Sequence, residues 1–74
     1  MAVHMTYLND IRESANKSQR DVSRDLSMSL STINRHERGK TPLNDLHRLG
    51  YAAYYGVAPD EIEQPSHGEG RKAA

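Results

Sequence analysis

Along much of the chain, apolar residues recur three or four positions apart, which is the spacing of one face of an α-helix. No segment alternates apolar and polar residues as a strand does, and there is no internal repeat. The pattern therefore predicts an all-α fold, a compact bundle of five short helices. The expected helices run from Tyr7 to about Ala15, over 18–26, from Leu30 to about Glu37, from Leu43 or Asn44 to Tyr55, and over 57–62.

The apolar positions of these helices are the expected core. In the second helix Val22 and Leu26 are four residues apart, and Ile33 is the inward residue of the third. In the fourth helix the leucines and alanines supply the apolar side, with tyrosines adding aromatic area. The expected inward residues of the first and fourth helices are Leu8, Ile11, Leu46, Leu49, Ala52 and Ala53, with Ala15 as a further candidate in the first helix.

The segment 17–40 carries the strongest local signals for helix starts and stops. Ser18 followed by Asp21 matches a capping box, and Ser29 is the natural N-cap of the next helix. Gly39 is a left-handed C-cap. The two short helices joined by a tight turn present hydroxyls, an amide and guanidiniums outward. Such groups match base edges in the major groove, where Arg suits guanine and Asn suits adenine.

The spaced residues of this segment also carry a family resemblance. The residues Ser18-Gln19, Val22, Leu26, Met28-Ser29, Ser31-Thr32-Ile33, Arg35 and Glu37-Arg38-Gly39 resemble the helix-turn-helix of the Cro/phage-repressor (XRE-like) family. The resemblance spans roughly Tyr7 to Ile62. It implies a lambda-repressor-like helix-turn-helix DNA-binding domain over 6–62, with the motif at 18–38 and a recognition helix at about 30–37. Three positions depart from the family pattern: Ser23, Ser27 (usually glycine) and His36 (often apolar).

The resemblance also implies roles for individual residues. Leu30 is expected either to touch a thymine methyl group or to be simply exposed, and Gln19 either to meet phosphate or to brace the recognition helix. For Lys17 and Arg20, a solvated surface charge is the alternative. Arg12 and Glu37 are expected to form a structural ion pair, with two solvated charges as the alternative. The expected base contacts are Leu30, Ser31, Asn34 and Arg35, and the expected phosphate contacts are Lys17, Ser18, Gln19, Arg20, Ser29, Arg38 and Lys40.

Composition restricts the classes of function. Seventy-four residues make one small domain, and the absence of cysteine excludes disulfides and fits a cytoplasmic location. No apolar run is long enough to span a membrane. The net charge is zero, but residues 1–40 hold seven Lys/Arg against five Asp/Glu, and residues 41–74 hold three against five. The positive charge therefore lies with the motif, as contact with phosphate requires.

The remaining chemistry argues against catalysis. No histidine lies four residues from another, and no cysteine assists, so a metal site is not expected. A chain this short leaves little room for a pocket, and no Ser/His/Asp set can be argued. We therefore expect no enzyme, no cofactor and no metal. Residues 63–74 are polar and without periodicity, and they predict a disordered tail.

The sequence as a whole predicts a sequence-specific regulator of transcription that binds double-stranded DNA. By resemblance it would be a repressor of phage or mobile-element type that binds an inverted repeat as a homodimer. The alternative is a protein-interaction module, or the antitoxin of a toxin–antitoxin pair, that keeps the fold and acts through a protein partner. The expected dimer contacts are Tyr51, Tyr54, Tyr55, Val57 and Ile62.

Overall fold

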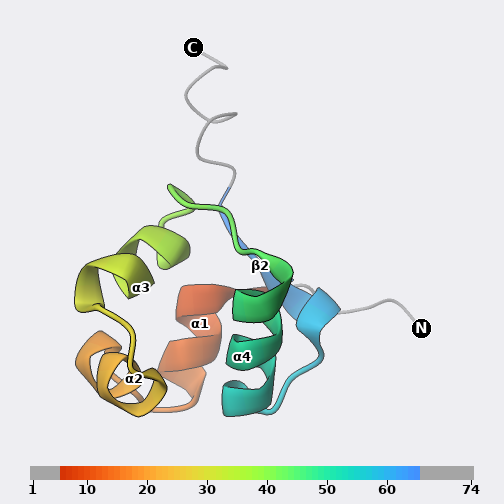
Figure 1. The fold of residues 1–74 in the computed structure, drawn as a ribbon. Helices are drawn as coiled ribbons and strands as arrows, with labels where there is room; N and C mark the ends of the chain where they lie inside the picture. The colour runs from red at the N-terminus through yellow and green to blue at the C-terminus, as the bar shows by residue number, and fades with distance from the viewer. Residues whose placement is uncertain (1–5, 66–74) are drawn as a thin grey trace.

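The computed structural model describes residues 6–65, in which four α-helices surround a shared interior (Figure 1). Helices α2 and α3 lie on one side of α1, and α4 lies on the other side (Figure 1). In chain order the elements are β1 (Thr6–Tyr7), α1 (Leu8–Ser14), α2 (Gln19–Leu26), α3 (Leu30–Glu37), α4 (Asp45–Tyr55), the 3₁₀ helix η1 (Pro59–Glu61) and β2 (Ile62–Glu63).

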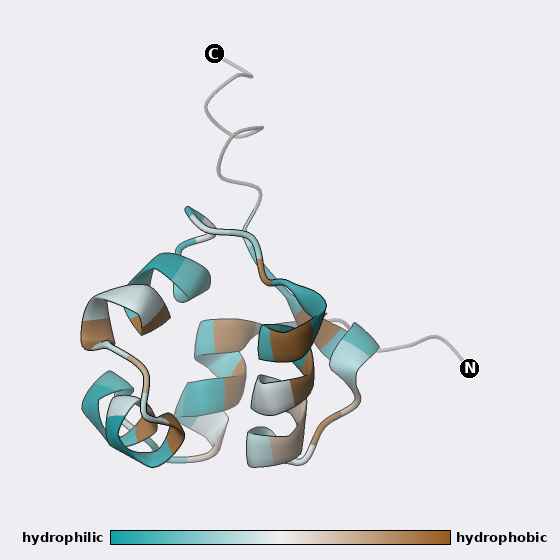
Figure 2. Ribbon diagram, viewed as in Figure 1, coloured by the Kyte–Doolittle hydropathy of each residue, from teal (hydrophilic) through white to brown (hydrophobic). Residues whose placement is uncertain are grey.

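The core combines residues from all four helices and from β2. Each helix carries hydrophobic and hydrophilic positions (Figure 2), as amphipathic helices around one core must. The predicted core residues of the first three helices are confirmed, apart from Leu26 and Ala15. Leu26 is only half-buried against the cluster, and Ala15, the further candidate of the first helix, is exposed. The buried hydrophobic residues are Leu8, Ile11, Val22, Ile33, Tyr51, Ala52 and Ile62.

The predicted inward face of the fourth helix is wrong. Leu46 is 76% exposed and Leu49 55% exposed, while Tyr51 is 1% exposed. A helix repeats every 3.6 residues, so Leu46 and Leu49 share a face that Tyr51 does not. Because tyrosine buries more apolar area than leucine, packing Tyr51 inside rotates the two leucines toward solvent. Ala52 lies in the core as predicted, and Ala53 is exposed.

The prediction of an all-α bundle of five helices also needs correction. The fifth helical segment is a three-residue 3₁₀ turn with Pro59 in its first turn. The flanking residues form a two-stranded parallel sheet, in which Thr6 pairs with Ile62 and Tyr7 with Glu63. Strands of two residues are too short for a visible alternation, so the sequence pattern could not reveal them. The sheet joins the two ends of the domain.

The tail predicted from residue 63 onward begins too early. Glu63 belongs to β2, and the Gln64 side chain makes three hydrogen bonds to the backbone of residues 36–43. The folded part therefore extends past the expected boundary at Ile62. The rest of the predicted tail, residues 66–74, lies outside the described residues.

Candidate nucleic-acid interface

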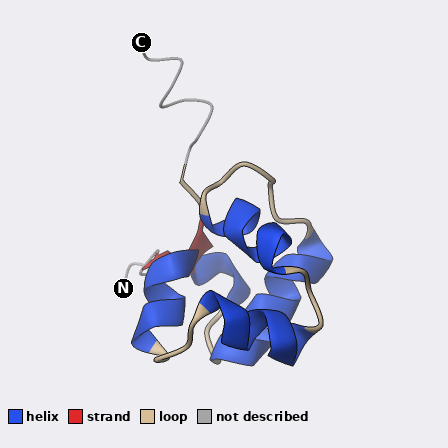
Figure 3. Cartoon of the chain, turned by 90° about the vertical axis from the view of Figure 1, so that its left-hand side faces the viewer, coloured by secondary structure: helices blue, strands red, loops and turns tan. Residues whose placement is uncertain are grey.

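Side-chain caps fix the starts of α2 and α3. The Ser18 hydroxyl accepts a hydrogen bond from the Asp21 backbone N–H (3.0 Å), and the Asp21 carboxylate accepts one from the Ser18 N–H (2.9 Å). At the start of α3 the Ser29 hydroxyl accepts a hydrogen bond from the Thr32 backbone N–H (3.1 Å). Ser27, between the two helices, has φ 55° and ψ 42°, which is the left-handed conformation that glycine usually occupies. The resulting helix–turn–helix unit faces the viewer in Figure 3.

Helix α3 has two chemically different faces. Ile33, His36 and Glu37 are buried. Ser31, Asn34 and Arg35 follow Leu30 by one, four and five residues, so the four predicted base contacts share one face of the helix. Leu30 is 39% exposed, Ser31 and Arg35 are exposed, and Asn34 is half-buried. The helix therefore presents one contiguous face of hydroxyl, amide and guanidinium groups beside a single leucine.

The buried carboxylate of Glu37 fastens α3 to α1 and α2. Arg12 Nε donates to Glu37 Oε2 at 2.7 Å, and Arg12 Nη2 donates to Glu37 Oε1 at 3.3 Å. Gln19 Nε2 donates to the same Oε1 at 2.9 Å. The hydrogen bond to Glu37 raises the pKa of Arg12. The pair expected from the resemblance is thus present, and Gln19 braces α3 through it.

The expected phosphate contacts occupy different environments. Arg20, Arg38 and Lys40 are exposed, and the Ser18 and Ser29 hydroxyls are used as helix caps. The Lys17 ammonium lies 3.8 Å from an Asp25 carboxylate oxygen and 5.8 Å from the centre of the Tyr54 ring. Lys17 is therefore engaged with other side chains, whereas Arg20, Arg38 and Lys40 extend from the surface.

His36, one of the three departures from the family pattern, lies fully in the interior. Its Nδ1 and the Tyr51 hydroxyl are 2.8 Å apart, so they share a hydrogen bond between α3 and α4. The centre of the His47 ring is 4.8 Å from that of His36. Burial is the main cause that lowers the pKa of His36, and the charge of His47 adds to it. At the position where the family pattern often has an apolar residue, the core thus contains a hydrogen-bonded His–Tyr pair.

Of the expected dimer contacts, two lie in the core and three lie against it. Tyr51 and Ile62 are each 1% exposed, and Tyr54, Tyr55 and Val57 are half-buried against the core cluster. Two of the five residues therefore have no surface to offer a partner, which corrects that part of the prediction. Among the described residues the large exposed hydrophobic side chains are Tyr7, Leu30, Leu46 and Leu49.

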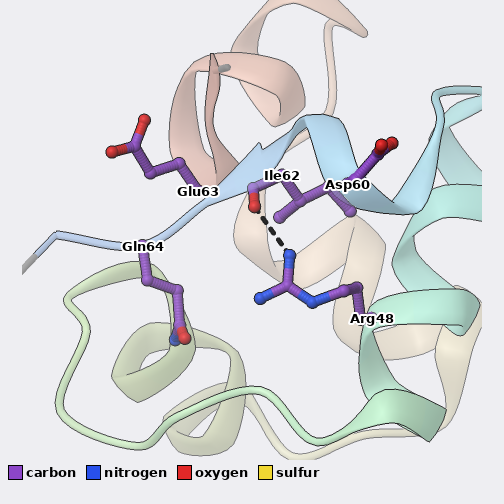
Figure 4. Close-up of a pocket in the computed structure, with 5 residues that line it drawn as sticks. All are labelled: Arg48, Asp60, Ile62, Glu63 and Gln64. Carbon is purple, nitrogen blue, oxygen red and sulfur yellow. Dashed lines mark hydrogen bonds between the residues drawn. The ribbon is translucent and has the colours of Figure 1, made fainter. Parts of the chain in front are cut away.

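A polar hollow lies on another side of the domain, between α4 and the segment that includes η1 and β2 (Figure 4). The Arg48 guanidinium lies in it and donates to the backbone oxygens of Pro59 (3.2 Å) and Ile62 (2.7 Å). Arg48 thus ties α4 to the C-terminal segment. Within residues 6–65 no three potential metal ligands gather, and no helix has the length and apolar character to cross a bilayer.

Gln64, whose side chain contacts the end of α3, is the residue that sequence reasoning missed. It joins β2 to the end of α3 through three hydrogen bonds of its side chain. Its neighbours in sequence are polar and lack periodicity, so no local signal distinguishes it from a tail residue.

The fold and the capped α2–turn–α3 unit together define a small helix-turn-helix protein. The chain belongs to the helix-turn-helix domain family, whose model matches residues 6–64. Membership indicates a DNA-binding regulator. Searches of curated proteins and of solved structures found no match to the chain.

Proposed function

We propose that the protein is a sequence-specific regulator of transcription that inserts α3 into the major groove of double-stranded DNA. The observation that carries the proposal is the outer face of α3, where Ser31 and Arg35 are exposed beside Asn34 while the inner face is locked in the core. Arg35 suits a bidentate contact with guanine, and Asn34 suits adenine. Leu30 adds an apolar contact for a thymine methyl group.

The phosphate contacts would surround this face. Arg38 and Lys40 follow α3 directly, and Arg20 lies at the start of α2. The N-terminal ends of the two helices, at Ser18 and Ser29, favour a phosphate as well, through the helix dipole and the first-turn N–H groups that the caps do not use. Lys17 and Gln19 contribute less directly, because each is already held by an acidic residue of the same chain.

The regulator would act as a homodimer on an inverted repeat. In the simplest case it would be a repressor of phage or mobile-element type that blocks a promoter. A single domain with few phosphate contacts gains useful affinity when two copies bind adjacent half-sites, because the second contact becomes intramolecular. Helix-turn-helix dimers place their recognition helices about one helical turn apart. Half-sites about ten base pairs apart are therefore expected.

The experiment that tests the function is selection of bound sequences from a random pool of double-stranded DNA at two salt concentrations. Enrichment of an inverted repeat with half-sites about ten base pairs apart supports the dimeric regulator. Enrichment of a single half-site supports the regulator and contradicts the dimer. Absence of any enriched sequence at both salt concentrations contradicts DNA recognition.

A second candidate is a protein-interaction module, or an antitoxin, that keeps the fold and acts through a protein partner. Two leucines exposed on α4, Leu46 and Leu49, and the net charge of zero favour it. Under this function the selection would enrich no DNA, and replacing Arg35 by alanine would change no binding property on DNA.

A further inference from the structure

The segment that follows η1 is anchored from two sides. Its strand β2 pairs with β1, through Ile62 with Thr6 and Glu63 with Tyr7. From the other side, the Arg48 guanidinium of α4 donates to the Ile62 backbone oxygen at 2.7 Å (Figure 4). The position of this segment is therefore set by the body of the domain.

From this segment the Gln64 side chain reaches the loop that follows α3, residues 39–43 (Figure 4). Gln64 Nε2 donates to the backbone oxygens of His36 and Thr41, each at 2.8 Å. Gln64 Oε1 accepts from the Leu43 backbone N–H at 3.0 Å. A primary amide has two N–H donors and a carbonyl acceptor, and here each kind is used on the backbone of 36–43. Glutamate lacks the donors and lysine lacks the acceptor, so neither could make all three bonds.

The loop and the segment are also in direct backbone contact. A Cβ atom built on Gly39 would lie 2.2 Å from the Pro65 backbone oxygen, and Gly39 has φ +75°. The N–H of Gly39 donates to His36 O and that of Lys40 to Arg35 O, which together form the Schellman end of α3. The loop is thus held between the end of the recognition helix and the anchored segment.

We propose that Gln64 is a positioning residue for DNA binding: by fixing residues 39–43 it holds Lys40 where the phosphate backbone passes α3. This inference rests on the proposed function. Lys40 is exposed and two residues beyond Arg38, at the end of the helix that carries the base contacts. A loop ordered in advance binds more tightly than a loose one, because its conformational entropy has already been lost on folding.

The test is a double-mutant cycle of Gln64→Met and Lys40→Ala, read as affinity for the selected operator over a series of salt concentrations. Methionine keeps the length and neutrality of glutamine but removes all three hydrogen bonds. We expect Gln64→Met to weaken binding about tenfold. The freed loop would have to lose about one residue's worth of conformational freedom when it binds DNA. Gln64→Met should also lower the salt slope by about 0.9, the value of one phosphate contact, as Lys40→Ala should. The double variant should have the same slope as either single variant.

Ile11→Val is the control for general destabilisation, because Ile11 lies in the core on α1, far from the loop in sequence and outside the expected DNA and dimer contacts. It should lower the unfolding temperature and leave the salt slope unchanged. If Gln64→Met does not fold, Gln64→Asn gives the same test, because its amide is one methylene too short to reach the loop.

Three outcomes overturn the proposal, and they are distinguishable. An unchanged salt slope in Gln64→Met contradicts positioning of Lys40 while leaving the DNA-binding function intact. Slope losses that add in the double variant show that the two residues act independently. A wild-type chain that selects no DNA refutes the proposed function and this inference together.

Discussion

Arg12 Nε on α1 lies 2.7 Å from Oε2 of Glu37, the last residue of α3, although the two residues are 25 positions apart in the sequence. Their side chains are 14% and 4% exposed, so both charged groups have lost most of their solvation by water. The orientation of α3 therefore depends on an ion pair that is nearly buried. Such a pair need not stabilise the fold relative to an apolar pair, but removing one partner leaves the other uncompensated.

Glu37→Ala should accordingly destabilise the domain by about 3–5 kcal/mol, because the Arg12 guanidinium and the Gln19 amide lose their common acceptor. A domain of this size has a total stability of roughly 4–11 kcal/mol, so much of it would be lost. Urea denaturation followed by circular dichroism measures the change. Glu13→Ala is the matched control: Glu13 lies 3.9 Å from Arg12 but is 65% exposed, so its loss should cost less than about 1 kcal/mol. Equal losses in the two variants would contradict the buried role.

The residues that the sequence predicts well are those whose signal is local. The capping box of Ser18 and Asp21 and the cap at Ser29 each involve residues three positions apart. These caps mark the starts of α2 and α3. The residues that it predicts badly depend on partners distant in sequence. The burial of Tyr51 follows from His36 on another helix, and the role of Gln64 follows from a loop more than twenty residues earlier. No periodicity encodes such pairings.

Ser27 tests how much the turn of the motif is strained. It adopts φ 55°, where an L-residue has a steric cost of about 1–2 kcal/mol that glycine avoids. Ser27→Gly should stabilise the domain by about 0.5–1 kcal/mol, because the greater freedom of glycine in the unfolded chain offsets part of the gain. The reverse substitution, Gly56→Ser, is the control: Gly56 has φ +74° with open space around it, so serine there should destabilise by a similar amount. Thermal unfolding of both variants decides the matter, and a loss of stability in Ser27→Gly would contradict the argument.

The buried His36 should make stability depend on pH. Burial lowers its pKa in the folded state below the ordinary value of 6.5. Below pH 6.5 the unfolded chain therefore binds a proton that the folded chain does not, so protonation favours unfolding. Stability should be complete above pH 6.5 and fall as the pH drops from there toward the lowered pKa. Denaturant midpoints at pH 7.5 and pH 5 measure this loss.

His36→Gln and His47→Gln separate the source of that dependence. Glutamine at 36 cannot be protonated, so the loss between pH 7.5 and pH 5 should shrink. In His47→Gln the burial that lowers the pKa of His36 remains, and most of the loss should persist. The opposite pattern would assign the pH dependence to His47.

Arg35 tests the base contacts directly. If its guanidinium binds one guanine, Arg35→Ala should weaken operator binding by about 1–3 kcal/mol and relax specificity at a single base position. Arg24→Ala is a matched control, because Arg24 is also an exposed helical arginine but lies beside Asp21 and Asp25 on α2. Its removal should leave the base preference unchanged. Selection from the random pool with both variants measures the two preferences, and an unaltered preference in Arg35→Ala would exclude Arg35 from base recognition and transfer that role to Asn34 or Ser31.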